Sequence, residues 1–127
     1  MYRYFLILLL AFTSCEYYSK INLSSRLPLI VKLEDNAKII WLTVSKKTQK
    51  NDLPIIEIKH YKERPTGFIN FDFLSSNYMV TSGVLDTLKF EPNKDYSIYI
   101  KTDKGYAGGE FYVDKDGNII TLPPYGE

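Results

Sequence analysis

Short runs of β-branched and aromatic residues recur along the chain, and apolar and polar positions alternate within them. In one run Ile69, Phe71 and Phe73 share one side of an extended segment, whereas Asn70 and Asp72 share the other. A period of two is typical of strands that bury one face. The same rule assigns further side chains to the core: Ile56, Ile58, Tyr96, Ile98 and Ile100. Helical spacing is not sustained over about three turns anywhere after residue 28, so the pattern predicts an all-β fold.

The runs are separated by residues that favour turns, such as Asp35-Asn36 and Ser82-Gly83. The predicted strands span residues 29–34, 38–44, 54–62, 67–73, 84–90, 95–102 and 110–114, with a last short strand at 118–122. Residues 103–109 contain three glycines and are expected to form a flexible loop. About seven or eight strands at this spacing predict a single two-sheet β-sandwich.

The N-terminal segment has a different pattern. Arg3 is followed by an unbroken apolar run from Phe5 to Phe12, which is typical of a secretory signal. At about 1.5 Å per residue, a helix of this run is far shorter than the ~30 Å hydrocarbon core of a bilayer. The run therefore predicts a targeting segment and not a permanent membrane span.

Thr13 and Ser14 follow the apolar run and lead directly to Cys15, the single cysteine of the chain. This order resembles the lipobox of bacterial lipoproteins, with Phe12 where that family usually has leucine. The resemblance implies a signal peptide over residues 1–14, a diacylglycerol on the Cys15 sulfur and a fatty acid such as palmitate on its amine. The protein would then be anchored in the cell envelope, facing the periplasm from the inner or outer membrane. The alternative is an ordinary secreted protein with one unpaired thiol, which an oxidising compartment disfavours.

Three regions follow from these features: the signal peptide, a lipidated N-terminus with a tether over residues 15–27, and a β-sandwich domain over residues 28–127. The tether is expected because residues 16–26 are polar and have no clear period. The domain has no cysteine for a disulfide, so apolar packing must stabilise it alone.

The segment from Phe90 to Tyr96 reads apolar-x-Pro-x-x-x-Tyr, with Pro92 in the third position. This resembles a signature of fibronectin type III modules, and Trp41 is similar to the core tryptophan of that family. The resemblance covers about residues 29–113 and implies an immunoglobulin-like sandwich. It also implies a tyrosine corner at Tyr96, in which the phenol hydroxyl bonds to upstream backbone.

Composition and charge exclude several functions. The chain has 16 Lys and Arg and 15 Asp and Glu, and removal of Arg3 with the signal makes the two counts equal. Nucleic-acid binding needs clustered positive charge, and the one basic cluster, at Lys46, Lys47 and Lys50, is interpreted as a solvated loop. No nucleic-acid partner is therefore expected.

The residues also argue against catalysis, metal binding and cofactors. His60 is the single histidine, and no nucleophile motif accompanies it. Asp114-Lys115-Asp116-Gly117-Asn118 resembles the start of a calcium loop, but Ile119 and Tyr125 stand where that loop needs Gly and Glu. We therefore expect a hairpin turn there, and a protein that is not an enzyme.

One set of side chains points to binding. If the third, sixth and seventh predicted strands share a sheet, its solvent face carries Tyr61, Tyr99 and Tyr112, with Tyr106 on the adjoining loop. Tyrosine is enriched in binding surfaces. Charges of both signs would surround these side chains: Glu57, Lys59, Lys101 and Glu110. The alternative is that the tyrosines only stabilise cross-strand pairs.

The sequence therefore predicts a membrane-anchored, non-catalytic module that binds a protein partner. Its layout is similar to that of periplasmic lipoproteins proposed as immunity proteins against type VI secretion effectors, which implies a secreted toxin as the partner. The alternatives are an accessory lipoprotein of an envelope assembly and, less favoured by the residues, a hydrolase.

Overall fold

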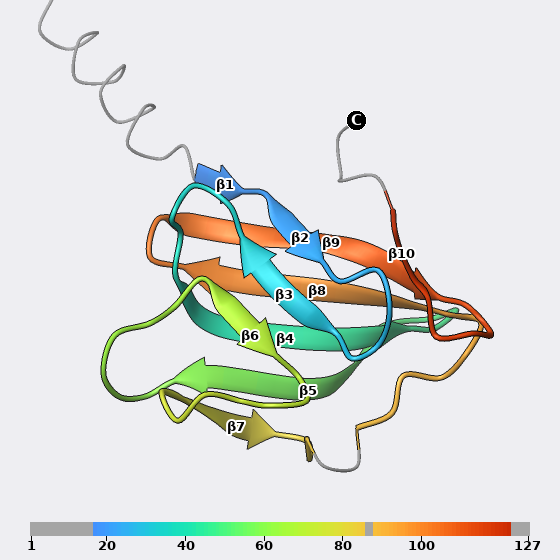
Figure 1. The fold of residues 1–127 in the computed structure, drawn as a ribbon. Helices are drawn as coiled ribbons and strands as arrows, with labels where there is room; N and C mark the ends of the chain where they lie inside the picture. Colours follow the sequence, from blue (N-terminus) through green and yellow to red (C-terminus); the bar gives the residue numbers. More distant parts are fainter. Residues whose placement is uncertain (1–16, 86–87, 123–127) are drawn as a thin grey trace, which may run out of the picture.

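The computed structural model describes residues 17–85 and 88–122, and these form two facing β-sheets (Figure 1). The larger sheet contains β1 (Tyr17–Ser19), β4 (Ile39–Lys47), β5 (Asp52–His60), β7 (Tyr78–Ser82), β8 (Lys94–Thr102), β9 (Gly105–Val113) and β10 (Ile119–Thr121). The smaller sheet contains β2 (Ile21–Leu23), β3 (Ile30–Leu33) and β6 (Phe68–Asn70). The predicted all-β sandwich is confirmed, with ten strands in the described residues instead of the expected seven or eight.

The strand order of the larger sheet is β1-β9-β8-β4-β5-β7, and that of the smaller sheet is β2-β3-β6. β1 runs parallel to β9, whereas the other paired strands are antiparallel. β10 also pairs with β9, at the end of β9 that β1 does not reach. The third, sixth and seventh predicted strands correspond to β5, β8 and β9, so they do share a sheet, with β4 between β5 and β8.

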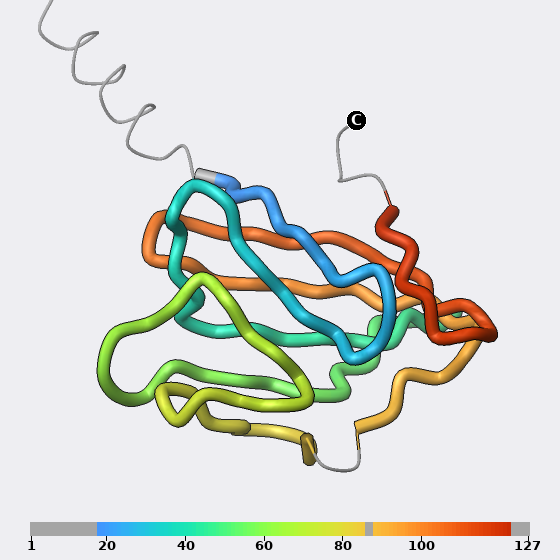
Figure 2. The backbone as a smooth tube through the Cα atoms, in the orientation of Figure 1, coloured from blue at the N-terminus to red at the C-terminus, as the bar shows by residue number. Residues whose placement is uncertain are grey.

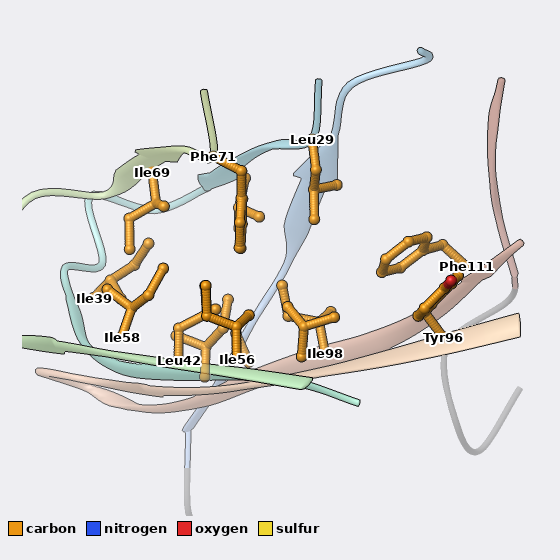
Figure 3. Close-up of a cluster of buried hydrophobic side chains, with 14 of the residues drawn as sticks. Leu29, Ile39, Leu42, Ile56, Ile58, Ile69, Phe71, Tyr96, Ile98 and Phe111 are labelled. Atoms are coloured by element: carbon orange, nitrogen blue, oxygen red, sulfur yellow. The ribbon is translucent and has the colours of Figure 1, made fainter. Parts of the chain in front are cut away.

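The core lies between the two sheets, where side chains from both inner faces meet (Figure 3). Ile69 and Phe71 from the smaller layer face Leu42, Ile56 and Ile58 from the larger one. The alternation rule is confirmed for every predicted core residue of the third and sixth predicted strands: Ile56, Ile58, Tyr96, Ile98 and Ile100. Full burial of one such aliphatic or aromatic side chain contributes roughly 1.5–3 kcal/mol, so this interior supplies the main stabilisation of a domain without disulfides.

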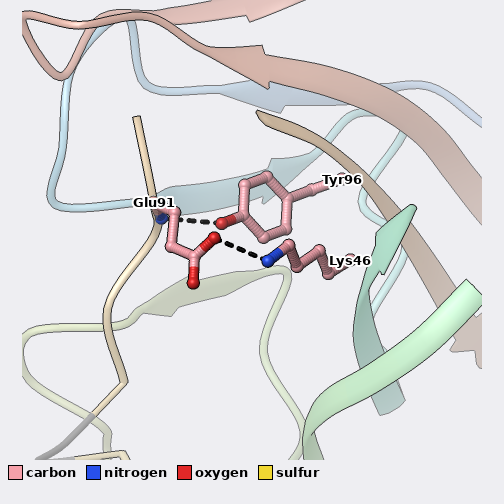
Figure 4. A network of polar contacts seen from close by, with 3 residues as sticks. All are labelled: Lys46, Glu91 and Tyr96. Carbon is pink, nitrogen blue, oxygen red and sulfur yellow. Dashed lines mark hydrogen bonds and ion pairs between the residues drawn. The ribbon is translucent and has the colours of Figure 1, made fainter. Parts of the chain in front are cut away.

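The phenol oxygen of Tyr96 is hydrogen-bonded to backbone upstream of it in the chain (Figure 4). The backbone N–H of Glu91 donates to the Tyr96 phenol oxygen over 2.7 Å. The Glu91 carboxylate pairs in turn with the Lys46 ammonium on β4. Burial raises the pKa of the Tyr96 phenol, so it remains protonated and neutral at physiological pH.

Part of the segment expected to be a tether belongs to the sheets. β1 lies along β9, the Ser19 side chain is buried, and the chain then crosses at Lys20 to the smaller sheet, where β2 pairs with β3. Half-buried Ile21 and Leu23 pack against the core. Two apolar residues in a three-residue strand are too few to give a recognisable period, which explains why the sequence does not reveal these strands.

The strand predicted at 84–90 is wrong, and the strand in this region is β7, at residues 78–82. After β7 the chain leads to β8, which β5 and β4 separate from β7 in the larger sheet (Figure 2). Its apolar side chains Leu85, Leu88 and Phe90 are half buried and pack against the core. These residues close one end of the sandwich, so their hydrophobicity has a cause other than strand pairing.

Phe73 was expected in the core but is 81% exposed. β6 ends at Asn70, and the chain turns there: the Phe73 N–H donates to the Asn70 carbonyl, and the Asp72 N–H donates to the Asn70 side chain. The alternation that buries Ile69 therefore does not continue as far as Phe73.

Candidate binding surface

An aromatic row crosses the outer, solvent-facing side of the larger sheet. We use this name for four residues on four neighbouring strands: Trp41 on β4, Tyr99 on β8, Tyr106 on β9 and Tyr18 on β1. The ring centroids lie 5.6 Å apart for Trp41 and Tyr99, 5.6 Å for Tyr99 and Tyr106, and 6.4 Å for Tyr106 and Tyr18. These spacings are those of interacting aromatic pairs, so the four rings form one continuous surface.

Trp41 belongs to this surface and not to the core, which corrects its expected role as a core tryptophan. The pairing of β4 with β8 shifts between Ile39, opposite Thr102, and Trp41, opposite Lys101. β4 therefore uses one extra residue, and such a bulge reverses which side chains face inward. Ile39 and Leu42 are buried as a result, while Trp41 is only half buried on the outer face.

The Trp41 indole is fixed in place by the neighbouring strand. Hydrogen bonds from the Trp41 side chain, and then from the Thr81 hydroxyl, lower the pKa of the Glu57 carboxyl. The Thr81 hydroxyl lies 2.8 Å from Glu57 Oε1. The indole N–H of Trp41 therefore has the Glu57 carboxylate, on the neighbouring strand β5, as its acceptor.

Tyr106 lies in β9 itself, which corrects its expected position on a loop. The glycine-containing segment predicted as a loop pairs with β8 from Tyr106 onward, and the connection between the strands is only Asp103-Lys104. Gly108 lies opposite Tyr99 in this pairing. Because Gly108 has no side chain, the outer face of β9 is recessed beside the Tyr99 ring.

The structure brings Tyr99 and Tyr106 together, but Tyr61 and Tyr112 lie outside the aromatic row. Tyr61 follows the end of β5, is 52% exposed, and has the Lys62 ammonium 5.5 Å from its ring. Tyr112 is half buried, and its hydroxyl donates to the Asn93 side chain over 2.9 Å. It lies six positions farther along β9 than Tyr106, or about 20 Å of strand.

The charges around the aromatic row are unequal in their exposure. Lys59 and Lys101 are exposed and both lie opposite Trp41, on the two strands that flank β4. Glu57 and Glu110 are half buried, and Glu110 pairs with the Lys47 ammonium at 2.7 Å. The sequence suggested charges of both signs around the tyrosines, whereas the exposed charges beside Trp41 are those of the two lysines.

The features considered for catalysis and metal binding have structural partners. One ring nitrogen of His60 lies 2.7 Å from the Glu63 carbonyl oxygen, and the ring meets Tyr78 edge-on. The Asp114 carboxylate accepts hydrogen bonds from the N–H groups of Asp116 and Asn118, which closes the predicted hairpin turn between β9 and β10. Among residues 17–85 and 88–122, the acidic, histidine and cysteine side chains form no cluster of three that could hold a metal ion.

Two members of the aromatic row were not identified as site residues from the sequence. Tyr18 is in the segment expected to be a tether, and Trp41 was expected in the core. The sequence around Trp41 gives two conflicting patterns: alternation from Ile39 would place Trp41 inward, whereas alternation from Leu42 and Val44 would place it outward. Cys15 and the signal peptide lie outside the described residues.

Comparisons with known protein families, with curated proteins and with solved structures gave no match for this chain. In the part of the chain that is described, no helix has the length and hydropathy needed to cross a bilayer.

Proposed function

We propose that this protein is a lipid-anchored lipoprotein of the bacterial envelope whose domain is a non-catalytic protein-binding module. The observation that supports this proposal best is the aromatic row on the outer face of the larger sheet. Tyr18 is 67% exposed and Tyr99 is 44% exposed, although each ring is in contact with another aromatic ring. Tyrosine and tryptophan are the side chains that most often dominate the energy of protein interfaces.

The surroundings of the row indicate the chemistry of the partner. Lys59 and Lys101 lie on either side of Trp41, so a complementary surface would present an apolar patch flanked by carboxylates. The partner is a secreted toxin if the protein acts as an immunity protein. It is a component of an envelope assembly if the protein is an accessory lipoprotein.

The proposed lipid anchor is inferred from the sequence around Cys15. An apolar run, two small residues and a single cysteine are the features by which a bacterial lipoprotein is processed and acylated. The lipid would hold the module at a periplasmic membrane surface, where the partner must be met.

A pair of double variants tests the binding surface. Tyr99→Thr with Tyr106→Thr removes the centre of the row, while the β-branched replacement preserves strand propensity. Tyr61→Thr with Tyr112→Thr removes the same number of tyrosines outside the row and is the matched control. The protein captured from membrane extracts by the full-length lipoprotein is identified by mass spectrometry, purified, and titrated against each variant.

We expect the row variant to bind this purified partner at least about 100-fold more weakly, as loss of hot-spot side chains does. The control variant should bind within a few-fold of the unaltered protein, and both should unfold at similar temperatures. Equal affinity of the row variant and the unaltered protein would show that the row is not the binding surface.

A further inference from the structure

We infer that one edge of the larger sheet, formed by β1 and β10, rests on the lipid headgroups of the membrane that holds the anchor. This inference depends on the proposed lipidation of Cys15. The edge is a second interaction surface, and its ligand is the lipid surface itself. Contact at this edge also fixes the direction in which the aromatic row faces a partner.

The chain between the proposed anchor and the sheet is very short. Only Glu16 separates Cys15 from Tyr17, the first residue of β1. A fully extended chain covers at most about 3.3–3.6 Å per residue, so the start of β1 lies within about 7 Å of the Cα atom of the lipidated residue. The polar headgroup layer of each leaflet is itself roughly 5–8 Å thick. The anchor therefore holds β1 at the level of the headgroups.

β1 is an integral part of the domain. Its three residues pair with Gly105, Tyr106 and Ala107 of β9. The Ser19 side chain is only 5% exposed, and the chain continues at once into β2 of the other sheet. The connection cannot be lengthened without separating β1 from β9, so the edge of the sheet is held where the lipid is.

β10 continues the same edge of the larger sheet. β1 pairs with the first residues of β9 and β10 with the last, both on the side of β9 that faces away from β8, so the two short strands follow one another along one border (Figure 1). Tyr18 is 67% exposed on β1 and Ile120 is 49% exposed on β10. Each of these two strands therefore exposes one large side chain with apolar surface, near opposite ends of the border.

The charged residues beside this border also suit a headgroup surface. Lys20 follows β1, and Arg26 forms an isolated bridge with Asn118, just before β10. Lys115 is exposed in the turn between β9 and β10, next to exposed Asp116. Tyrosine and long basic side chains are favoured at the membrane interface, where their apolar parts and polar ends can be satisfied together.

In this orientation the aromatic row runs away from the membrane surface, starting at the border of the sheet. Tyr18 lies at the border, and β4, which carries Trp41, is three strand spacings away. At about 4.8 Å per spacing, Trp41 is about 14 Å above the border and clear of the headgroups. A partner would therefore meet Tyr99 and Trp41 from the side, while it lies at the same membrane surface.

Tryptophan fluorescence tests the orientation, because Trp41 is the single tryptophan of the chain. The full-length lipoprotein is purified with its own anchor and reconstituted into vesicles of phosphatidylethanolamine and phosphatidylglycerol, which contain some phosphatidylcholine with a spin label on the headgroup. Two reporters are made in a Trp41→Phe background. Ile120→Trp places the fluorophore on the β10 border, and Met79→Trp places it on β7, at the opposite edge of the sheet, where Met79 is also exposed.

We expect the spin label to quench the Ile120→Trp reporter roughly twofold more than Met79→Trp, because only the first lies within the headgroup layer. Unaltered Trp41 should be quenched little. Ile120 pairs with Tyr112, near the end of β9 that is remote from the anchor. Quenching at Ile120 therefore shows that the whole border contacts the headgroups. If only the end of the border next to the anchor touched the membrane, the Ile120→Trp reporter would not be quenched. Equal quenching of the two reporters would overturn the inference.

Mass spectrometry and vesicle flotation separate this inference from the proposal on which it depends. A chain without the added lipid that fails to float with vesicles overturns both the anchoring and the orientation. A lipidated chain that floats, with the Ile120→Trp reporter unquenched, overturns the orientation alone and leaves the anchoring in place.

Discussion

A Cβ atom added to Gly108 would lie 2.9 Å from the carbonyl oxygen of Ile98 on the neighbouring strand. Contacts this short are avoided in proteins, and the oxygen belongs to a backbone that β8 and β9 hold by hydrogen bonds. We therefore expect Gly108→Ala to destabilise the domain by roughly 1–3 kcal/mol, as overpacking does. Urea unfolding followed by circular dichroism measures this change.

Gly109→Ala is the matched control for this prediction. The closest atom to a Cβ at Gly109 is Ile21 Cδ1 at 3.4 Å, which is the end of a flexible side chain. Its cost should be clearly smaller than that of Gly108→Ala. Equal losses of stability would mean that the strand only requires glycine for its flexibility, and not for the close approach at Ile98.

Removal of the Tyr96 hydroxyl is expected to cost about 1–2 kcal/mol of unfolding free energy. In Tyr96→Phe the Glu91 N–H loses its acceptor, while the ring keeps its packing against Phe90 and Phe111. Tyr61→Phe removes the same hydroxyl from a ring that is 52% exposed and should leave stability nearly unchanged. Chemical denaturation of the two variants checks the prediction, which is wrong if they lose equal stability.

Tyr78→Phe should be more damaging than Tyr96→Phe. The Tyr78 phenol oxygen accepts from the Thr66 N–H at 2.8 Å, and it lies 2.7 Å from the Ile39 carbonyl oxygen, to which it donates. Loss of this one oxygen leaves both the Ile39 carbonyl and the Thr66 N–H without their partner. Each such group costs roughly 1–3 kcal/mol of unfolding free energy when it remains unsatisfied. We expect a lower unfolding midpoint than for Tyr96→Phe at an unchanged denaturant slope. The reverse order of midpoints would contradict the assignment.

The sequence predicts the parts of this fold in which local pattern and tertiary structure agree. Alternation identifies the inward residues of β5 and β8, such as Ile58 and Ile98, because those strands are long and buried on one face. It fails at Phe90, whose hydrophobicity comes from closing the end of the sandwich, and at β1, whose strand pairing is too short to leave a period. Tertiary context decides those positions.

The candidate site shows the same division. Exposure of Tyr99 follows directly from alternation on β8. The position of Trp41 depends on a register shift between β4 and β8. No residue type in the sequence predicts such a shift. The contact between Tyr18 and Tyr106 depends on a parallel pairing of segments almost ninety residues apart. Sequence periodicity contains no information about which distant strands become neighbours.

Acidification should release Trp41 at a pH below the ordinary titration range of glutamate. Hydrogen bonds from Trp41 and Thr81 lower the pKa of Glu57 in the folded state. A carboxyl group with a lowered pKa contributes stability that is present above its ordinary value, about 4.3, and is lost as the pH falls through the folded value. The emission of the single tryptophan should therefore stay constant on acidification to about pH 4.3 and change only below it.

Glu57→Gln provides the control for this titration. The amide keeps an acceptor for the indole N–H but has no proton to gain, so the change in Trp41 emission should disappear before global unfolding begins. Far-ultraviolet circular dichroism, recorded on the same samples, separates the local change from loss of the fold. A transition at or above about pH 4.3 in the unaltered protein, or one that persists in Glu57→Gln, would show that another group controls the environment of Trp41. Confirmation would establish that Glu57 fixes the end of the aromatic row farthest from β1, at every pH above that transition.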